Sequence, residues 1–153
     1  MEGHAKLQNL ASFRQTIGEM FRLAGAYAAD LERLPHGFDN IFQVYNYVRD
    51  LPYHEDPRGL ETVSRPVYTL SGEWQGPRDC DDKTVIILAA AKKFGIPARA
   101  IVCGEGSAPH HVYPELLLSG QWIPFDATYS DTKHDCRLGE RLYGEAFREE
   151  LYG

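Results

Sequence analysis

Several features by which whole classes of protein are recognised are missing from this sequence. No run of about eighteen or more apolar residues occurs, as a membrane-spanning helix would require. The N-terminal stretch MEGHAKLQNL also lacks the apolar core of a signal peptide. We therefore expect a protein that is made in the cytoplasm and has no membrane among its partners.

Basic residues are fewer than acidic residues in this chain. The chain has 16 Lys and Arg against 22 Asp and Glu, which gives a formal net charge of −6. A surface that binds nucleic acid needs clustered Lys and Arg to neutralise phosphates. We therefore expect no nucleic-acid partner.

Cysteine is scarce too, and its spacing argues against two further classes. The 3 cysteines, Cys80, Cys103 and Cys136, are far apart, and none belongs to a C-x-x-C pair. This pattern favours reduced thiols over a disulfide framework. The nearest approach to a metal-ligand cluster is His134-Asp135-Cys136, for which a polar surface loop is the simpler interpretation. The sequence thus predicts no metal site and no cofactor.

What is present suits one globular domain. The chain has 153 residues, of which 43% are hydrophobic and 25% charged, and it contains no internal repeat. We expect a single domain over residues 1–153. Within it we distinguish an N-terminal helical segment (1–37), a core (38–130) and a C-terminal extension (131–153).

The N-terminal segment carries a helical pattern. Apolar residues recur at steps of three and four from Leu7 to Leu34, which predicts an amphipathic helix over residues 5–34. Gly18 and Gly25 interrupt the pattern and are expected to bend or split the helix. The apolar stripe either docks on the core or binds a protein partner.

Two shorter helices are expected elsewhere. Asp39 or Asn40 can cap a helix that runs from Ile41 to about Asp50. A charged stretch near the C-terminus has the pattern of a short amphipathic helix. Its apolar positions are Leu138, Leu142, Ala146 and Leu151.

The stretch PRDCDDKT opens the most informative helix. A helical pattern begins at Cys80 and ends near residue 94, before a Gly-Ile-Pro stop signal. Residues 85–91 are apolar all round, so this helix should lie buried at the centre of the molecule. Asp79 stands at the N-cap position and Asp82 completes a capping box, which makes Cys80 the first helical residue.

The first turn of a helix is a distinctive place for a thiol. Unpaired N–H groups and the helix dipole favour the thiolate there, whereas the neighbouring aspartates oppose it. A base close to Cys80 would make it a nucleophile. Without such a base, the residue is better explained as a small buried side chain.

A base, and a carboxylate to hold it, are found in a predicted hairpin. Two β-rich runs, 111–118 and 121–126, flank a Ser-Gly turn. A two-residue turn pairs Tyr113 with Asp126 and makes His111 and Asp126 diagonal neighbours on one face, roughly 7 Å apart. A loop of odd length would put Asp126 on the opposite face.

Three ordered motifs, DCDDKTVIILAAAKKFGIPARA, HHVYPEL and QWIPFDAT, resemble those of the transglutaminase-like superfamily, whose core is papain-like. The stretch YVRDLPYHEDPRGLETVSRPVYTLSG resembles the lead-in found in members encoded by phages and prophages. The likeness covers roughly residues 41–130. It implies an α+β fold in which a central buried helix carrying the cysteine packs on an antiparallel β-sheet, here with an extra N-terminal helix.

The resemblance also implies roles for individual residues. The nucleophile falls on Cys80, the base on His111 of the H-V-Y-x-E stretch, and the orienting carboxylate on Asp126 of the F-D-A-T stretch. His110 begins no such match and should point to the opposite face. Arg78 stands where the family usually has Gly, which bears on substrate access to the thiol.

The residues that would bind the oxyanion and the substrate near Cys80 match no motif of the family. The Cys80 N–H is a natural first donor to an oxyanion. Trp74 or Gln75 is a candidate for the second donor, and Tyr113 for substrate binding.

The implied activity is cysteine-dependent acyl transfer on an amide or peptide bond of a protein or peptide, through a Cys-His-Asp triad. Hydrolysis is favoured over cross-linking to a lysine amine, because members of bacterial and phage origin resemble hydrolases more often. The alternative is a non-catalytic structural or assembly module of a phage particle that retains the fold. The protein would accordingly reside in the cytoplasm of a bacterial host or be associated with the virion.

Overall fold

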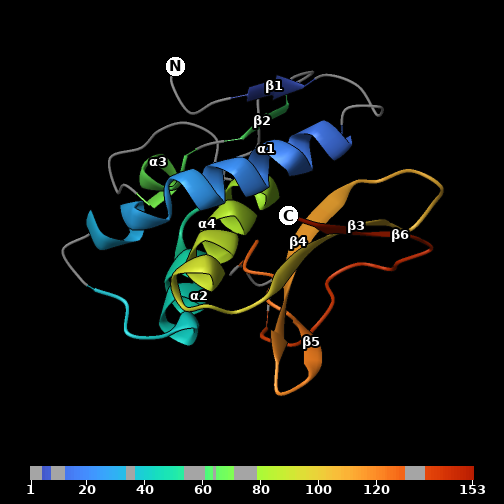
Figure 1. Ribbon diagram of the computed structural model, residues 1–153. Coiled ribbons are helices and arrows are strands. Elements are labelled where there is room, and N and C mark those ends of the chain that lie inside the picture. Colours follow the sequence, from blue (N-terminus) through green and yellow to red (C-terminus); the bar gives the residue numbers. More distant parts are fainter. Residues whose placement is uncertain are drawn as a thin grey trace.

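The computed structural model describes residues 5–7, 13–33, 37–53, 61–63, 65–70, 79–129 and 137–153. Its helices gather on one side of the molecule and its main sheet on the other (Figure 1). The helical elements are α1 (Phe13–Ala26), the 3-10 helix η2 (Ala28–Arg33), α2 (Ile41–Asp50), α3 (Pro66–Leu70) and α4 (Cys80–Lys93). The strands are β1 (Ala5–Leu7), β2 (Glu61–Val63), β3 (Ala98–Gly104), β4 (His111–Leu118), β5 (Gln121–Pro124) and β6 (Phe147–Tyr152).

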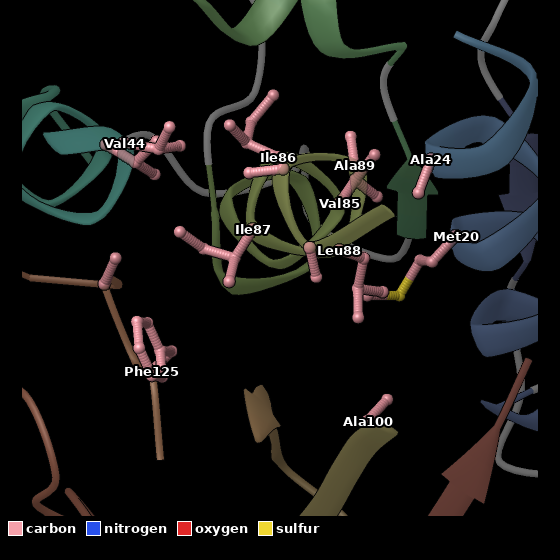
Figure 2. Packing of buried hydrophobic residues seen from close by; sticks show 14 of the residues in the cluster. Met20, Ala24, Val44, Val85, Ile86, Ile87, Leu88, Ala89, Ala100 and Phe125 are labelled. Carbon is pink, nitrogen blue, oxygen red and sulfur yellow. The ribbon is translucent and has the colours of Figure 1, made fainter. Parts of the chain in front are cut away.

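The central helix is α4, as its apolar sequence predicts. Ile86 and Ile87 are fully buried. Met20 of α1, Val44 of α2 and Ala100 of β3 lie around α4 on different sides (Figure 2). The helix is therefore enclosed by other elements along most of its length, which explains why its apolar residues form no one-sided stripe.

The start of α4 has the expected cap. The Asp79 carboxylate accepts hydrogen bonds from the N–H groups of Asp81 and Asp82, at 3.1 and 3.3 Å. The Asp82 carboxylate accepts in return from the Asp79 N–H, at 3.1 Å. The predicted capping box is thus confirmed, and it fixes Cys80 as the first helical residue.

The main sheet has the strand order β5-β4-β3-β6, with every neighbouring pair antiparallel. In the β4–β5 hairpin, Leu118 pairs with Gln121. The turn residues Ser119 and Gly120 both have positive φ, 53° and 76°. Such a turn matches the right-handed twist of the two strands. The α+β fold is confirmed, and so is the predicted register from Leu118–Gln121 to Glu115–Pro124. Strand β5 ends at Pro124 instead of residue 126, so the predicted pair of Tyr113 with Asp126 lies beyond the ladder.

The expected helix over residues 5–34 is wrong at both ends. Ala5–Leu7 is strand β1, which pairs with β2, and a 3-10 segment follows α1. Hydrophobic periodicity cannot reveal such a pairing, because the partner strand is distant in the sequence. Within α1 the apolar stripe is as expected: Ile17 and Met20 are buried, and the helix packs on α4.

The expected C-terminal amphipathic helix is also wrong. Phe147–Tyr152 form β6, which pairs with β3 so that Leu151 lies opposite Ala100. Phe147 and Leu151 pack against the core, whereas the intervening Arg148 makes polar contacts. This alternation has the period of a strand. The free edge of β3 therefore overrode a weak helical pattern.

The other helices are short or amphipathic. The first turn of α2 is capped by Asn40, whose side chain accepts from the Gln43 N–H as expected of a cap. Within the described ranges, no helix combines the length and the apolar character needed to cross a membrane.

Candidate active site

Cys80 opens α4, and its side chain is partly exposed. The Val112 N–H of β4 donates a hydrogen bond to the sulfur. The sulfur also lies 3.7 Å from Oδ1 of Asp81, to which the S–H group can donate. The helix start thus brings the thiol to the first residues of β4, within reach of solvent.

The β4–β5 hairpin holds a histidine and an aspartate in contact. Nε2 of His111 lies 2.6 Å from Oδ2 of Asp126, and the two residues are only 6% and 1% exposed. Oδ1 of Asp126 accepts from the N–H and the hydroxyl of Thr128. Because both carboxylate oxygens are bonded, the carboxylate is fixed, and Nδ1 is the ring nitrogen left for proton exchange.

Val112 connects the two halves of this site. It follows His111 in β4, and its N–H is bonded to the sulfur of Cys80. The structure therefore brings Cys80, His111 and Asp126, the three residues expected to form a triad, into one region.

The surroundings of Cys80 disfavour its thiolate. Burial raises the pKa of the thiol well above its ordinary value, and the negative charges of Asp81 and Asp79 raise it further. The hydrogen bond from the Val112 N–H acts in the opposite direction. At rest the residue is thus a neutral thiol, which needs a base before it can act as a nucleophile.

Asp126, by contrast, is held ionised. Burial opposes its charge, but the hydrogen bond and the charge of His111, with the two bonds from Thr128, outweigh that effect. The pKa of the Asp126 carboxyl therefore lies below its ordinary value. An ionised carboxylate can accept a hydrogen bond from the Nε2–H group of His111 and so fix the tautomer of the imidazole.

Lys83 ties two loops to the first turn of α4. Its side chain is 1% exposed, and its ammonium group donates to three carbonyl oxygens. These belong to Leu51 at 2.7 Å, Thr128 at 2.9 Å and Arg49 at 3.3 Å. The lysine thereby anchors the chain after α2 and the chain after Asp126 beside Cys80. A lysine just before the apolar run of a buried helix was the available sequence signal, and motif reasoning missed it.

Three tyrosines that the sequence analysis did not single out also lie at this site. The ring centroids of Tyr53 and Tyr129 are 4.6 Å apart, and the ring of Tyr143 meets that of His111 edge to face at 4.7 Å. The negative charge of an ionised Cys80 would act on both Tyr53 and Tyr143. They come from three separate segments, so nothing local in the sequence connects them.

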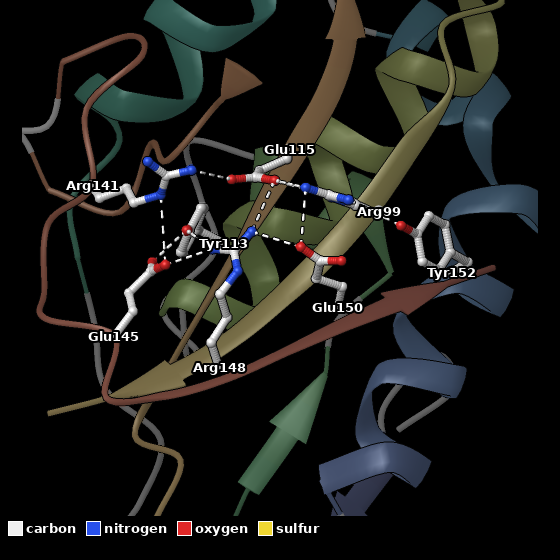
Figure 3. Close-up of polar contacts among 8 residues, drawn as sticks. All are labelled: Arg99, Tyr113, Glu115, Arg141, Glu145, Arg148, Glu150 and Tyr152. Carbon is white, nitrogen blue, oxygen red and sulfur yellow. Dashed lines mark hydrogen bonds and ion pairs between the residues drawn. The ribbon is translucent and has the colours of Figure 1, made fainter. Parts of the chain in front are cut away.

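Tyr113 is part of a polar network on the face of the sheet away from α4 (Figure 3). It is 1% exposed, and its hydroxyl donates to Glu145 and accepts from Arg148. Its ring stacks on that of His111 at 5.8 Å. A buried side chain with an engaged hydroxyl offers little surface to a substrate, so the position of Tyr113 favours support of His111 over the expected substrate contact.

Glu115 is the central acid of the same network. It has no exposed surface, and its carboxylate accepts from Arg99 at 2.7 and 3.0 Å. Arg141 at 3.2 Å and Arg148 at 3.4 Å contact it as well. The network thus joins β3, β4 and β6 with the segment before β6.

The other residues singled out in the sequence are either described without a bond to the thiol or lie outside the described residues. Cys103 is fully buried, and burial together with Glu145 raises its pKa to about 12. His110 is exposed and precedes β4, with its ring 5.1 Å from that of Tyr143. The residues Trp74, Gln75, Arg78, His134, Asp135 and Cys136 lie outside the described residues. In the described part of the chain, no three His, Cys, Asp or Glu residues are arranged to hold a metal ion.

Comparisons with known proteins place the chain in a family. No match was found among curated proteins. A crystal structure of a proposed cysteine protease from Cytophaga hutchinsonii is similar at 18% identity and a TM-score of 0.42, and the match covers 90% of this chain but 48% of that one. The chain thus spans about half the length of that protein. The model of the transglutaminase-like superfamily matches residues 25–127, which is most of the chain. The protein therefore belongs to the transglutaminase-like superfamily.

Proposed function

We propose that this protein catalyses cysteine-dependent acyl transfer on an amide or peptide bond of a protein or peptide, with water as the acceptor. The observation that carries the proposal is the buried bond between His111 and Asp126 beside the Cys80 thiol. A histidine oriented by a carboxylate next to a thiol is the arrangement that activates a cysteine nucleophile. Membership of the transglutaminase-like superfamily supports the same chemistry.

In the first half-reaction, Nδ1 of His111 takes the proton of the Cys80 thiol. The thiolate forms a bond to the carbonyl carbon of the substrate, and the carbonyl oxygen becomes an oxyanion. As the C–N bond breaks, the imidazolium returns the proton to the leaving amine. An acyl thioester on Cys80 remains.

In the second half-reaction, His111 takes a proton from a water molecule, whose oxygen attacks the thioester. The C–S bond breaks, the carboxylic acid leaves, and the proton returns to the sulfur. Throughout both steps, Asp126 accepts the hydrogen bond from Nε2 and stabilises the imidazolium.

The resting electrostatics indicate when the proton moves. Burial, Asp81 and Asp79 keep the thiol protonated, so a stable thiolate is not expected before substrate binds. We therefore expect His111 to act as a general base during attack. The rate should then depend strongly on this histidine.

The direct test is to trap the acyl-enzyme. The protein is incubated with a panel of amide and peptide substrates, quenched in acid and analysed by peptide-resolved mass spectrometry. An acyl group on Cys80 and release of the free acid are expected. Cys80→Ser and His111→Ala should each lose several powers of ten in turnover while remaining folded. Turnover by either variant at a rate comparable with the wild type would refute the assignment, and accumulation of a lysine-linked product would identify an amine as the acceptor.

The non-catalytic alternative, an assembly module of a phage particle, depends on a surface for a partner. The apolar stripe of α1 was the expected surface, but its residues Ile17, Met20 and Leu23 are buried, and α1 packs on α4. Phage origin and virion association stay predictions from the sequence. A chain that never acylates Cys80 yet co-purifies with particles would favour this alternative.

A further inference from the structure

The C-terminal part of the chain reaches the candidate active site. The family match ends at residue 127, and the structure describes a further segment beyond it, residues 137–153. Strand β6 forms the end of this segment, and Tyr143 lies in the irregular stretch before β6. The ring centroid of Tyr143 is 4.7 Å from that of His111, and the two ring planes are inclined by 65°. A residue outside the matched part of the chain thus contacts the proposed base.

The stretch that carries Tyr143 is held on both sides of this residue. On the side toward the N-terminus, the Gly139 N–H donates to the carbonyl of Pro124, the last residue of β5, at 3.0 Å. On the other side, Glu145 accepts a hydrogen bond from the hydroxyl of Tyr113 in β4, and β6 then pairs with β3. The main sheet, which also carries the histidine, therefore fixes the place of Tyr143.

The imidazole of His111 is contacted by a carboxylate and by aromatic rings. Oδ2 of Asp126 lies 2.6 Å from Nε2. The ring of Tyr113 stacks on the imidazole with centroids 5.8 Å apart, and the ring of Tyr143 makes the closer contact, edge to face. Both centroid distances fall in the range of about 4.5–7 Å in which aromatic pairs attract one another. The carboxylate thus acts on one nitrogen, whereas the tyrosines act on the ring as a whole.

The difference matters because of the way in which a histidine ring turns. The torsion about its Cβ–Cγ bond has broad minima, so a weak force can rotate the plane of the ring. The bond to Asp126 restrains Nε2, which lies closer to the rotation axis than Nδ1 does. Rotation therefore carries Nδ1, the nitrogen that has to meet the thiol proton, through the wider arc. A contact against the ring restrains this rotation directly.

We propose that Tyr143 is a positioning residue for acyl transfer, whose ring holds the imidazole of His111 at the rotation that aims Nδ1 at the Cys80 thiol. The inference rests on the proposed function, in which His111 takes the thiol proton. The ring is the part of Tyr143 that acts on the base, because the hydroxyl is engaged in a hydrogen bond with Tyr129. The segment beyond the family match is thereby part of the active site.

The test measures acetylation of Cys80 by p-nitrophenyl acetate, in which the thiol loses its proton, the S–C bond forms and p-nitrophenolate leaves. The rate is followed by peptide-resolved mass spectrometry, with Cys80→Ser as the blank. Tyr143→Leu removes the ring, and Tyr143→Phe keeps it. Tyr152→Leu is the matched control, because it removes a ring from the same C-terminal segment that is 62% exposed and packs on Trp122 instead of His111.

We expect Tyr143→Leu to slow acetylation about 10- to 100-fold, the loss that follows when a catalytic group is slightly misplaced. Tyr143→Phe should stay close to the wild-type rate, because the ring remains, and Tyr152→Leu should leave the rate unchanged. Circular dichroism and urea unfolding give the folded fraction to which each rate is normalised. If Tyr143→Leu does not fold, Tyr143→Met, which is closer to tyrosine in length, takes its place.

A double-mutant cycle shows whether Tyr143 acts through the histidine. His111→Ala retains only the acetylation that needs no imidazole. With no ring left to hold, adding Tyr143→Leu to His111→Ala should cause no further loss. A purely structural role of Tyr143 would instead slow acetylation equally in the wild-type and His111→Ala backgrounds.

The remaining outcomes would contradict the inference or the function beneath it. Acetylation of Tyr143→Leu at the wild-type rate would overturn the inference alone, and so would an equal loss in the His111→Ala background. A Tyr143→Phe rate as low as that of Tyr143→Leu would do the same, because the hydroxyl and not the ring would then matter. A wild-type protein that is never acetylated at Cys80 would contradict the proposed function, and the inference with it.

Discussion

Nε2 of His111, the first residue of β4, lies 2.6 Å from Oδ2 of Asp126, which stands just beyond the end of β5. The contact is shielded from water, because both side chains are buried. An ionised carboxylate at Nε2 places a proton on that nitrogen and leaves the lone pair on Nδ1. The pair therefore holds the imidazole in the tautomer that can accept a proton from a thiol.

Asp126→Asn should slow acyl transfer by several powers of ten, roughly 10⁴-fold if it acts only through the tautomer. The amide can turn its NH₂ group toward Nε2 and so move the ring proton to Nδ1, where it blocks acceptance from Cys80. The decisive measurement is the rate of Cys80 acylation, with folding checked by circular dichroism. Thr128→Val is the matched control: it removes a hydroxyl bonded to the same carboxylate and should cost far less activity. An Asp126→Asn rate near that of the wild type would show that the carboxylate does not orient the base.

Asp126 should also contribute to stability in a pH-dependent way. The pKa of the Asp126 carboxyl is lower in the folded protein than in the unfolded chain, where an Asp titrates at about 3.9. Its stabilising contribution is therefore complete above that pH and is lost as the pH falls through the folded-state pKa. The free energy of unfolding, measured by urea titration from pH 7 to pH 3, should differ most between wild type and Asp126→Asn near neutrality. A difference that widens on acidification would contradict this sign.

Asp81 should hold back the reactivity of the thiol. Its Oδ1 lies 3.7 Å from the Cys80 sulfur, and its charge raises the pKa of the thiol. In Asp81→Asn the opposing charge is gone, so that pKa should fall and alkylation by iodoacetamide at pH 7 should speed up, about tenfold for each unit of pKa. The pH profile of Cys80 alkylation measures the shift. Asp39→Asn, at an exposed position before α2, is the control. A pH profile that is unchanged in Asp81→Asn would show that Asp81 does not raise the pKa of the Cys80 thiol.

Much of the site was predictable because its determinants are local. The capping box around Cys80 depends on residues within one helical turn, and the hairpin register depends on a two-residue turn. The first places the thiol at the start of a helix, and the second places His111 near Asp126, whereas the approach of the thiol to His111 depends on the packing of α4 against β4. The cap, the apolar run and the Gly-Ile-Pro stop signal likewise identified α4, and two β-rich runs around a Ser-Gly turn identified the β4–β5 strands.

The missed features depend on partners that are distant in sequence. Strand β1 is stabilised by its pairing with β2, and β6 is stabilised by its pairing with the edge of β3. Neither strand therefore needs a clear hydrophobic periodicity in its own sequence. The position of Lys83 in a buried helix was visible in the sequence, but its role became clear only from the carbonyls of Leu51 and Thr128 that accept from it. The tyrosines at the thiol come from three segments that meet only in the folded chain.

The buried acid of the polar network should be a large contributor to stability. Glu115 has no exposed surface and contacts three arginines, Arg99, Arg141 and Arg148. Glu115→Gln leaves these cations without their central partner, which should lower the free energy of unfolding by about 3 kcal/mol. Glu150→Gln is the matched control, because its side chain is 40% exposed and a pair of that kind contributes about 1 kcal/mol or less. Equal effects of the two substitutions in urea unfolding would show that burial of Glu115 does not matter.

Lys83 should matter both for stability and for the geometry of the site. Its ammonium group donates to the carbonyls of Arg49, Leu51 and Thr128, and its side chain is almost fully buried. Lys83→Met fills a similar volume but leaves those carbonyls without a donor, so the free energy of unfolding should fall by about 3 kcal/mol, toward the upper end for loss of a buried partner. Because Thr128 also bonds Asp126, release of its segment should loosen the carboxylate at His111 and lower acylation of Cys80 in the fraction that remains folded. Lys93→Met, at the far end of the same helix where the side chain is 25% exposed, is the control and should have little effect on either quantity. Urea unfolding and the rate of Cys80 acylation are measured on the same preparations. If Lys83→Met matched Lys93→Met in both quantities, this role of Lys83 would be contradicted.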